Sequence, residues 1–300
     1  MKLARAVVHE LMVQPGKPAG LSRRSTSTTR SDWLGPLGRA HPKEVAEHDL
    51  DAFKSALMVA QDLLYASDRW SLLLVFQALD AGGKDGTIKH VMSGVNPQGC
   101  DVISFKQPSE VELRHDFLWR CSTRLPERGH IGIFNRSYYE DVLVVRVHPE
   151  LAARRPAGAA VGEGIWRERY EDINAFERHL VRNGTRVVKF FLHVSEHEQR
   201  RRLLERLGDP AKQWKFSASD LAEHGRFAEY QAVYEEAITA TSTAWAPWFV
   251  VPADHKYALR ALVGGVVVDE IDSLDLSRPE PDAAQRQAIE KAAEALRAER

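Results

Sequence analysis

Short apolar runs alternate along the chain with longer segments whose apolar positions recur at helical spacing. Nearly continuous apolar runs are typical of strands buried on both faces, as in a parallel sheet covered by helices on each side. The predicted strands are residues 70–78, 101–105, 130–135, 186–194 and 248–252. The predicted helices are residues 42–67, 166–183, 196–207, 218–243, 255–271 and 282–300. This alternation predicts an α/β domain with a doubly wound parallel sheet.

Helix-start signals support the same architecture. Capping boxes of the form Ser-x-x-Glu begin at Ser109, Ser137 and Ser195, and each follows a predicted strand within a few residues. In a capping box the serine side chain and the glutamate side chain satisfy backbone N–H groups in the first turn of a helix. Three such signals in the same position favour repeated strand-then-helix units.

The domain boundaries follow the periodicity. Residues 1–42 lack sustained periodicity and include the polar run LSRRSTSTTRSD, which predicts an irregular N-terminal arm. Residues 43–276 hold all the predicted strands and form the main domain. Residues 277–300 form an Ala/Glu/Arg-rich tail, predicted to be helical.

Composition narrows the class of protein. The 300 residues are 44% hydrophobic and 28% charged, which is ordinary for a soluble globular protein. No apolar run approaches the roughly 20 residues that span a bilayer, and the short, interrupted apolar stretch at the N-terminus does not resemble a secretory signal. The two cysteines imply neither a disulfide framework nor a cysteine-rich zinc site. We therefore expect a cytoplasmic protein without a membrane partner.

Charge is balanced globally but not locally. The net charge of −1 gives no sign of a nucleic-acid partner. Residues 178–215, however, hold ten Lys/Arg against four Asp/Glu, a balance of +6. A solvated helix face is the ordinary interpretation of such a segment, and it becomes a candidate polyanion-binding surface only if it lies beside a phosphate site.

A glycine-rich turn, FQALDAGGKDGTIKH at residues 76–90, follows the first predicted strand. Such turns bind phosphate because glycines let backbone N–H groups converge on the anion at the start of a helix. The pattern G-x-x-x-x-G-K-[ST] would require Gly at Ala78 and Ser or Thr at Asp85. Lys84 supplies the mobile cation, and Asp80 offers the carboxylate that a hard cation prefers. The alternative is a tight structural turn in which Asp85 caps the helix.

A second cluster, GIFNRSYYEDVLVVRVH at residues 132–148, follows the strand predicted at 130–135. Its polar residues emerge at the carboxyl end of the strand, where ligands bind in doubly wound sheets. Arg136 can clamp phosphate through its planar guanidinium, and Asp141 is a second candidate metal ligand. Glu140 has the competing role of completing the cap begun by Ser137.

A third stretch, RRLLERLGDPAKQWKFSASD at residues 201–220, combines a basic helix with a break at Gly208–Pro210. Basic lids of this kind close over the transferring phosphoryl group, exclude water and neutralise charge in many phosphotransferases. We therefore predict a basic helical lid at about residues 200–220.

Together these stretches resemble the second polyphosphate kinase family, polyphosphate kinase 2, over about residues 45–276. The resemblance rests on LDAGGKDGTIKHVMSGVNPQGC, FNRSYYEDVLVVRVHPE, KQWKFSASDL and ATSTAWAPWFVVPADHKYALR. The run from Asn135 to Asp141 resembles the class III branch, whose members phosphorylate nucleoside mono- and diphosphates. Asp85 fits the family, which has Asp or Gly after the loop lysine. Ala78 departs from it, because members usually have Gly there.

The resemblance implies a three-layer α/β/α sandwich related to P-loop nucleotide kinases such as thymidylate kinase, with a helical lid. It implies Mg²⁺, or Mn²⁺ in its place, held by Asp80 and Asp141. The implied catalytic residues are Asp80, Lys84, Arg136, Glu140 and Asp141. The implied phosphate- and nucleotide-binding residues are Ala81, Gly82, Gly83, Asp85, Gly86, Thr87, Lys89, Asn135, Arg201, Lys212 and Lys215.

The implied reaction moves the terminal phosphoryl group of inorganic polyphosphate to AMP or ADP, with GMP and GDP as further acceptors. Its partners are polyphosphate and adenine or guanine nucleotides, and the resemblance implies a homo-oligomer, either a dimer or a tetramer. Two alternatives stay open from the sequence. One is an ATP-dependent nucleoside monophosphate kinase, against which the missing Ser/Thr of the loop argues. The other is a non-catalytic nucleotide or polyphosphate sensor, which Ala78 alone favours.

Overall fold

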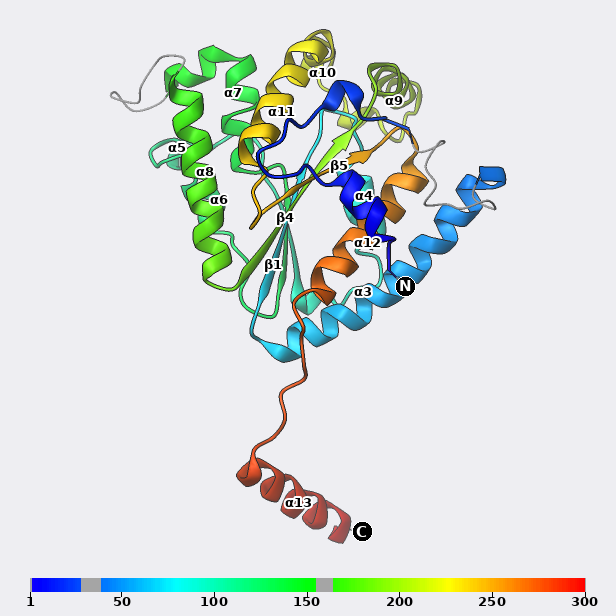
Figure 1. Cartoon of the computed structure of the whole chain (residues 1–300), viewed down its shortest axis with the longest axis vertical. Helices are drawn as coiled ribbons and strands as arrows, with labels where there is room; N and C mark the ends of the chain where they lie inside the picture. The colour runs from blue at the N-terminus through cyan, green and yellow to red at the C-terminus, as the bar shows by residue number, and fades with distance from the viewer. Residues whose placement is uncertain (1, 28–38, 155–163, 300) are drawn as a thin grey trace.

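Strand β1 lies at the centre of a parallel sheet (Figure 1). The computed structural model describes residues 2–27, 39–154 and 164–299, and within them the sheet has five strands in the order β2-β3-β1-β4-β5. The strands are β1 (Ser71–Gln77), β2 (Cys100–Ser104), β3 (Ile131–Asn135), β4 (Thr185–His193) and β5 (Trp248–Pro252). The chain moves from β1 to one side for β2 and β3, and then crosses to the other side of β1 for β4 and β5. Such a reversal opens a crevice at the carboxyl ends of the central strands, where ligands bind in open α/β sheets.

The two faces of the sheet explain the continuous apolar runs. In β1, Leu72, Leu74 and Phe76 belong to the hydrophobic core on one face, whereas Leu73 and Val75 belong to the core on the other. Successive side chains of a strand point to opposite faces. A strand that is covered on both sides therefore needs an apolar residue at nearly every position.

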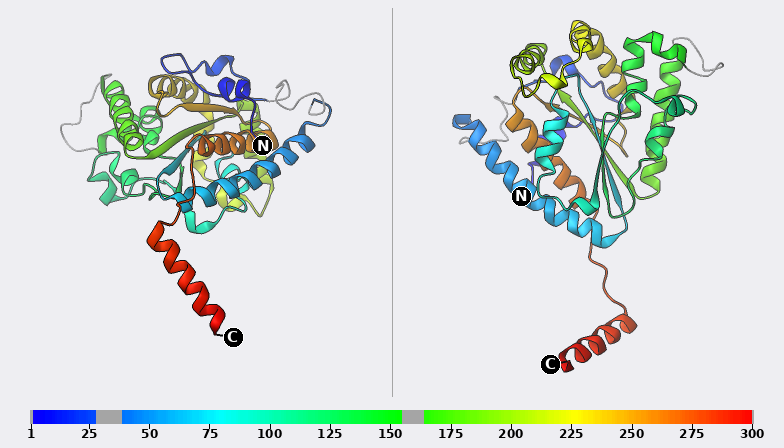
Figure 2. Two further views of the ribbon diagram at one scale, coloured as in Figure 1. Left: turned by 60° about the horizontal axis from the view of Figure 1, so that its bottom comes forward. Right: turned by 180° about the vertical axis from the view of Figure 1, so that it is seen from behind.

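Helices cover both faces and produce the three-layer α/β/α sandwich (Figures 1 and 2). The first layer is α3 (Pro42–Ser67), α4 (Lys84–Val91) and α12 (Lys256–Asp272). The second layer is α7 (Val144–Val147), α8 (Gly164–Arg182) and α11 (Phe227–Thr241). The remaining helices are α1 (Arg5–Leu11), α5 (Glu110–Leu113), α6 (Trp119–Ser122), α9 (Glu196–Gly208), α10 (Ala218–Gly225) and α13 (Ala283–Ala298). The 3-10 turns are η1 (Leu21–Arg23), η3 (Pro97–Gly99), η4 (Tyr138–Asp141), η5 (Pro149–Arg154) and η6 (Gln213–Lys215).

This architecture confirms the predicted fold class, and the predicted strands begin and end within one residue of β1 to β5. The segment predicted as helical from 218 to 243 is divided, because α10 ends at Gly225 and α11 begins at Phe227. Glycine lowers helix propensity and commonly ends helices, which accounts for the break. Helix α9 ends at Gly208, where the lid was predicted to bend.

The described residues of the N-terminal arm, 2–27, are irregular apart from α1 and η1, and they are held against the rest of the domain. Helix α1 forms there, the N–H of Val13 donates to the carbonyl of Trp248 (2.8 Å), and Met12 forms an antiparallel bridge with Phe249. The carboxylate of Glu235 accepts hydrogen bonds from the N–H groups of Gly20 (2.8 Å) and Leu21 (2.6 Å). These tertiary contacts order a segment too short for its own periodicity to reveal. Residues 28–38 of the arm lie outside the described residues.

The C-terminal helix α13 stands apart from the sandwich (Figure 2). None of its residues is buried, and residues 273–282 join it to α12. Within the described ranges, no helix combines the length and apolar character needed to cross a bilayer.

Candidate active site

The loop between β1 and α4 has the backbone of a phosphate cradle. Gly83, which precedes the first residue of α4, has a φ of +104°, and Ala81 has a φ of +59°. A Cβ built on Gly82 would lie 2.7 Å from the Cβ of Ala78 and 2.8 Å from the carbonyl oxygen of Leu79. Position 82 therefore has no room for a side chain, and Gly83 adopts a conformation that glycine favours.

Ala78, the residue that departs from the family pattern, lies at the entrance to this turn. It is buried, and its methyl group occupies the space beside Gly82. Its carbonyl oxygen accepts a hydrogen bond from Nζ of Lys84 (2.7 Å). The methyl group therefore tightens the packing of the turn without blocking the position of the loop lysine.

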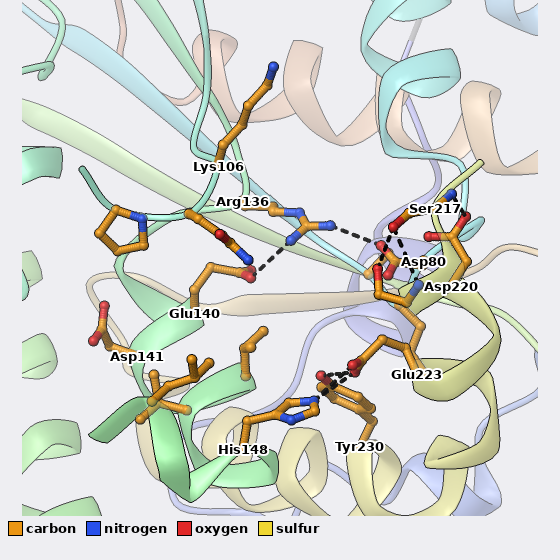
Figure 3. Close-up of a pocket in the computed structure, with 18 of the residues that line it drawn as sticks. Asp80, Lys106, Arg136, Glu140, Asp141, His148, Ser217, Asp220, Glu223 and Tyr230 are labelled. Carbon is orange, nitrogen blue, oxygen red and sulfur yellow. Dashed lines mark hydrogen bonds and ion pairs between the residues drawn. The ribbon is translucent and has the colours of Figure 1, made fainter. Parts of the chain in front are cut away.

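Arg136 joins the phosphate loop to the segment that follows β3. It has a φ of +64°, and its N–H donates to the carbonyl of Phe76 (3.1 Å). One Nη donates to Asp80 (2.9 Å) and the other contacts Glu140 (3.5 Å). The charge of Glu140 raises the pKa of Arg136. The guanidinium therefore lies between two carboxylates at the carboxyl ends of adjacent strands (Figure 3).

Glu140 does not complete a helix cap. Ser137 caps η4 by accepting from the N–H of Tyr139 (3.2 Å), whereas the carboxylate of Glu140 faces Arg136. With its amide oriented to suit both neighbours, Gln77 donates to Glu140 (2.9 Å). Burial raises the pKa of the Glu140 carboxyl, while the charge of Arg136 opposes that rise. The structure thus corrects the capping interpretation and places Glu140 in the site.

The other two predicted caps differ from each other. Ser109 and Glu112 form the complete capping box at α5. At α9, Ser195 accepts from the N–H of Glu198 (3.1 Å), but the Glu198 carboxylate binds arginines on its own helix. A charged guanidinium binds a carboxylate more strongly than a backbone N–H does, so Glu198 binds the arginines and does not complete the capping box.

The two predicted metal ligands do not lie side by side. Figure 3 shows Asp80 and Asp141 on opposite sides of the pair formed by Arg136 and Glu140. Asp80 is the carboxylate bound by Arg136, and the backbone carbonyl of Asp141 accepts from buried Arg169 (2.8 Å). Among the described residues, no group of three or more His, Cys, Asp or Glu side chains could together hold a metal ion.

The first residues of α4 complete the loop. Asp85 is exposed and accepts a hydrogen bond from the side-chain amide of Asn135 (2.7 Å), so two predicted binding residues from β3 and α4 do meet. Thr87 is buried and faces the core, whereas Lys89 is exposed. Gly86 lies beside the guanidinium of Arg260.

A cavity of about 530 Å³ lies beside the loop. Asp80, Arg136, Glu140 and Asp141 line it, which brings four of the five predicted catalytic residues to one space. The lining also includes the apolar side chains of Leu113, Val144, Val145 and Leu151. A lining with both polar and apolar side chains suits a ligand that carries both phosphate and a flat ring.

Several lining residues were missed by the sequence reasoning. These are Lys106 and Arg120 after β2, Gln199 on α9, Glu223 on α10, and Tyr230 and Tyr234 on α11. Lys106 could have been found, because it directly follows the strand predicted at 101–105, as Arg136 follows the strand predicted at 130–135. The side chains on α10 and α11 reach the cavity only through tertiary packing, which leaves no local signal.

The predicted lid cations lie on the surface, paired with neighbours. Arg201 binds Glu198 and Glu205, and Lys212 binds Asp209 (2.6 Å). Neither lines the cavity. Lys215 lies in η6, and its side chain is outside the described residues.

Two cations of the +6 segment are buried rather than aligned along a surface. Nζ of Lys189 lies 2.6 Å from the carboxylate of Glu177, and both side chains are fully buried. Glu177 also accepts hydrogen bonds from the hydroxyls of Tyr138 and Tyr139, each at 2.9 Å. This network fixes the part of η4 that lies between Arg136 and Glu140. The other buried cation, Arg202, contacts the phosphate loop.

A histidine contact joins α10 to the C-terminal end of α7 beside the cavity (Figure 3). Nε2 of His148 lies 2.8 Å from Glu223 on α10, and Nδ1 lies 3.0 Å from Glu150. Carboxylates only accept hydrogen bonds, so the ring holds protons on both nitrogens in this arrangement. Desolvation alone would lower the pKa of His148, but the hydrogen bonds to Glu223 and Glu150 raise it above its ordinary value of 6.5.

The His148→Gln variant is expected to lose thermal stability relative to the original chain at pH 6, and to differ little from it at pH 9. Because the pKa is raised in the folded state, the contribution is complete below pH 6.5 and is lost as the pH rises through the folded value. Melting temperatures of both proteins at several pH values test this. An equal difference at pH 6 and pH 9 would contradict it.

Known proteins share this sequence and fold. Residues 40–279 match the family model of polyphosphate kinase 2. The chain is 53% identical over 231 residues to an ADP-polyphosphate phosphotransferase of Rhodopseudomonas palustris, covering 76% of this chain and 80% of the relative. It is 44% identical over 247 residues to an AMP/ADP-polyphosphate phosphotransferase of Meiothermus ruber, covering 82% and 89%.

A solved structure has a fold similar to that of this chain. The crystal structure of polyphosphate kinase 2 from Arthrobacter aurescens TC1 superposes with a TM-score of 0.85 at 35% identity, covering 97% of this chain and 99% of that one. The family match spans most of the chain and includes the phosphate loop, the segment after β3 and the lid. The chain therefore belongs to the polyphosphate kinase 2 family.

Proposed function

We propose that this chain transfers the terminal phosphoryl group of inorganic polyphosphate to AMP and ADP, and also to GMP and GDP. Polyphosphate-dependent phosphoryl transfer to a nucleotide is the reaction of its family. The names of the two relatives support adenine nucleotides as acceptors, one naming ADP and the other AMP and ADP. The observation that carries the proposal is the position of Arg136 and Asp80 beside the phosphate loop, in the lining of a cavity that also has apolar side chains.

The residues present fit a magnesium ion. Mg²⁺ prefers oxygen ligands and usually takes one or two carboxylates together with substrate phosphates and water. Asp80 and Asp141 both line the cavity and are the proposed ligands. Because no group of three or more such side chains among the described residues could hold the ion by itself, substrate phosphates and water would have to supply the other ligands. When bound, the ion supplies positive charge to phosphoryl oxygens; Mn²⁺ has the same ligand preference.

The reaction needs alignment more than proton transfer. An oxygen of the nucleotide's terminal phosphate attacks the end phosphorus of polyphosphate, the bond to the next bridging oxygen breaks, and a chain one unit shorter leaves. Because the attacking oxygen is already anionic, no general base is required. Lys84 and Arg136 neutralise charge on the transferring group, and Glu140 orients Arg136.

One experiment tests both the phosphate donor and the nucleotide acceptor. Purified protein is incubated with Mg²⁺ and polyphosphate and, separately, with AMP, ADP, GMP or GDP, and the products are separated by ion exchange. A parallel series replaces polyphosphate with ATP. We expect ADP from AMP and ATP from ADP with polyphosphate as donor. Transfer from ATP to AMP without use of polyphosphate would show a nucleoside monophosphate kinase, and binding without turnover would show a sensor.

The dimer or tetramer expected from the resemblance stays a prediction. Helix α13 supports it, because Ile289 and Leu296 are exposed on a helix that buries no residue against the sandwich. The mass of the protein in solution, measured by light scattering, tests it.

A further inference from the structure

Helix α9 contacts three consecutive carbonyl groups of the phosphate loop. The side-chain amide of Gln199 donates to the carbonyl of Asp80 (3.0 Å). One Nη of Arg202 donates to the carbonyls of Ala81 (3.2 Å) and Gly82 (3.0 Å). Gln199 and Arg202 are three residues apart, so they lie on the same face of the helix. The loop is thus held along one side by two side chains of a single turn.

Arg202 has no donor left for a substrate. Its Nε donates to Glu198 (2.7 Å), and its second Nη donates to the carbonyls of Ala253 and Asp254. With the two loop carbonyls, the five N–H groups of the guanidinium face five acceptors. The side chain is only 5% exposed. Arg202 is therefore built into the protein and does not resemble a cation that waits for polyphosphate.

The conformation that these contacts hold is a strained one. Ala81 has a φ of +59°, a left-handed backbone conformation that is unfavourable for an L-residue other than glycine. Such conformations persist where surrounding contacts determine them. The bonds from Arg202 to Ala81 and Gly82 fall at this position.

Fixing the carbonyls also fixes the opposite side of the loop. In a planar trans peptide the C=O of one residue and the N–H of the next point in opposite directions. With the carbonyls of Asp80 and Gly82 directed at α9, the N–H groups of Ala81 and Gly83 point away from that helix. Backbone N–H groups are the part of such a loop that binds phosphate.

We propose that Gln199 and Arg202 are positioning residues that hold the phosphate loop in its anion-binding conformation. The proposal rests on the function proposed above for the same site. Gln199 also links the loop to α10, because its side-chain oxygen lies 2.7 Å from Nδ1 of His224 on that helix. The arginine of α9 that contacts the phosphate loop is thus Arg202, rather than its neighbour Arg201.

Charge-conserving variants test the idea. Lysine at position 202 keeps the charge but replaces the planar fork with one ammonium group, which cannot reach acceptors in several directions. We expect Arg202→Lys to lower kcat by about 10²-fold, the scale of a small misplacement of reacting groups. Gln199→Met, which keeps the volume and removes one contact to the loop, is expected to lower kcat by about tenfold. The control is Arg200→Lys, an exposed position on the same helix, for which we expect no change in kcat.

Two further measurements separate positioning from stability and from function. Hydrogen exchange of the 79–86 segment in the apoprotein is expected to be faster in Arg202→Lys and unchanged in Arg200→Lys. Tripolyphosphate binding, measured by calorimetry without nucleotide, is expected to weaken in Arg202→Lys only. If the original chain has no turnover, the proposed function is wrong. Hydrogen exchange and tripolyphosphate binding then still test whether Arg202 holds the loop in its anion-binding conformation. A lower melting temperature with unchanged exchange, binding and kcat would overturn it, because Arg202 would then be only structural.

Discussion

Replacing Lys84 with methionine is expected to lower kcat by about 10³-fold, the upper range for loss of one preorganised charged donor. Lys84 is the first residue of α4, and its Nζ is held at the carbonyl of Ala78 inside the loop. Burial and the neighbouring charge of Arg136 lower the pKa of Lys84. An anionic phosphate at this position would offset both effects, so the ammonium gains most when the transferring group is present. Initial rates at saturating polyphosphate and ADP measure the loss.

The control for Lys84→Met is Lys291→Met, which removes the same charge from the exposed face of α13. We expect Lys291→Met to keep the original kcat. Methionine has nearly the length of lysine without its charge, so the packing of the loop is kept. A Lys84→Met protein with kcat within about tenfold of the original, correctly folded, would remove Lys84 from the catalytic group.

The sheet was predictable because burial on both faces leaves a local trace. Every residue of β1 is buried, and its apolar run marks the strand directly. The N-terminal segment left no such trace, because Met12 is held by β5 and Gly20 by Glu235, both far along the chain. The division between α10 and α11 left only a weak trace, because the glycine at position 225 lowers helix propensity by a small amount.

The site was predictable where residues lie at strand ends. Asp80 follows β1 and Arg136 follows β3, and pairing of these strands brings the two side chains together. The sequence could not predict that Arg202, rather than Arg201, contacts the phosphate loop. One residue of a helix turns the direction of the side chain by about 100°, and the sequence does not show which direction faces the loop. The burial of Lys189 was not predictable for another reason. The sequence does not distinguish a buried lysine from a surface cation unless its partner, here Glu177, is known.

Replacing Lys189 with methionine is expected to lower the free energy of unfolding by about 3–5 kcal/mol, the usual cost of removing one partner of a buried ion pair. Glu177 would remain with the two tyrosine hydroxyls but without its cation. Burial raises the pKa of Glu177 in the folded state, and the charge of Lys189 opposes that rise, so removing the lysine is expected to raise this pKa further. The loss is therefore expected to be smaller at pH 5 than at pH 8, because a group with a raised pKa is stabilising at low pH and loses that contribution as the pH rises. Urea unfolding at both pH values measures it.

The double variant Lys189→Met with Glu177→Gln separates charge from packing. Glutamine keeps an oxygen that accepts from both tyrosines but carries no charge, so the double variant is expected to be about 2 kcal/mol more stable than Lys189→Met alone. It is not expected to regain full stability, because the carbonyl of Thr241 loses the donor that Lys189 supplies at 2.7 Å. Equal stability of the single and double variants, with no dependence on pH, would show that the lost packing of the lysine dominates over the unpaired charge. If the double variant folds but has low kcat, the network is needed to hold η4, and with it Arg136 and Glu140, in place.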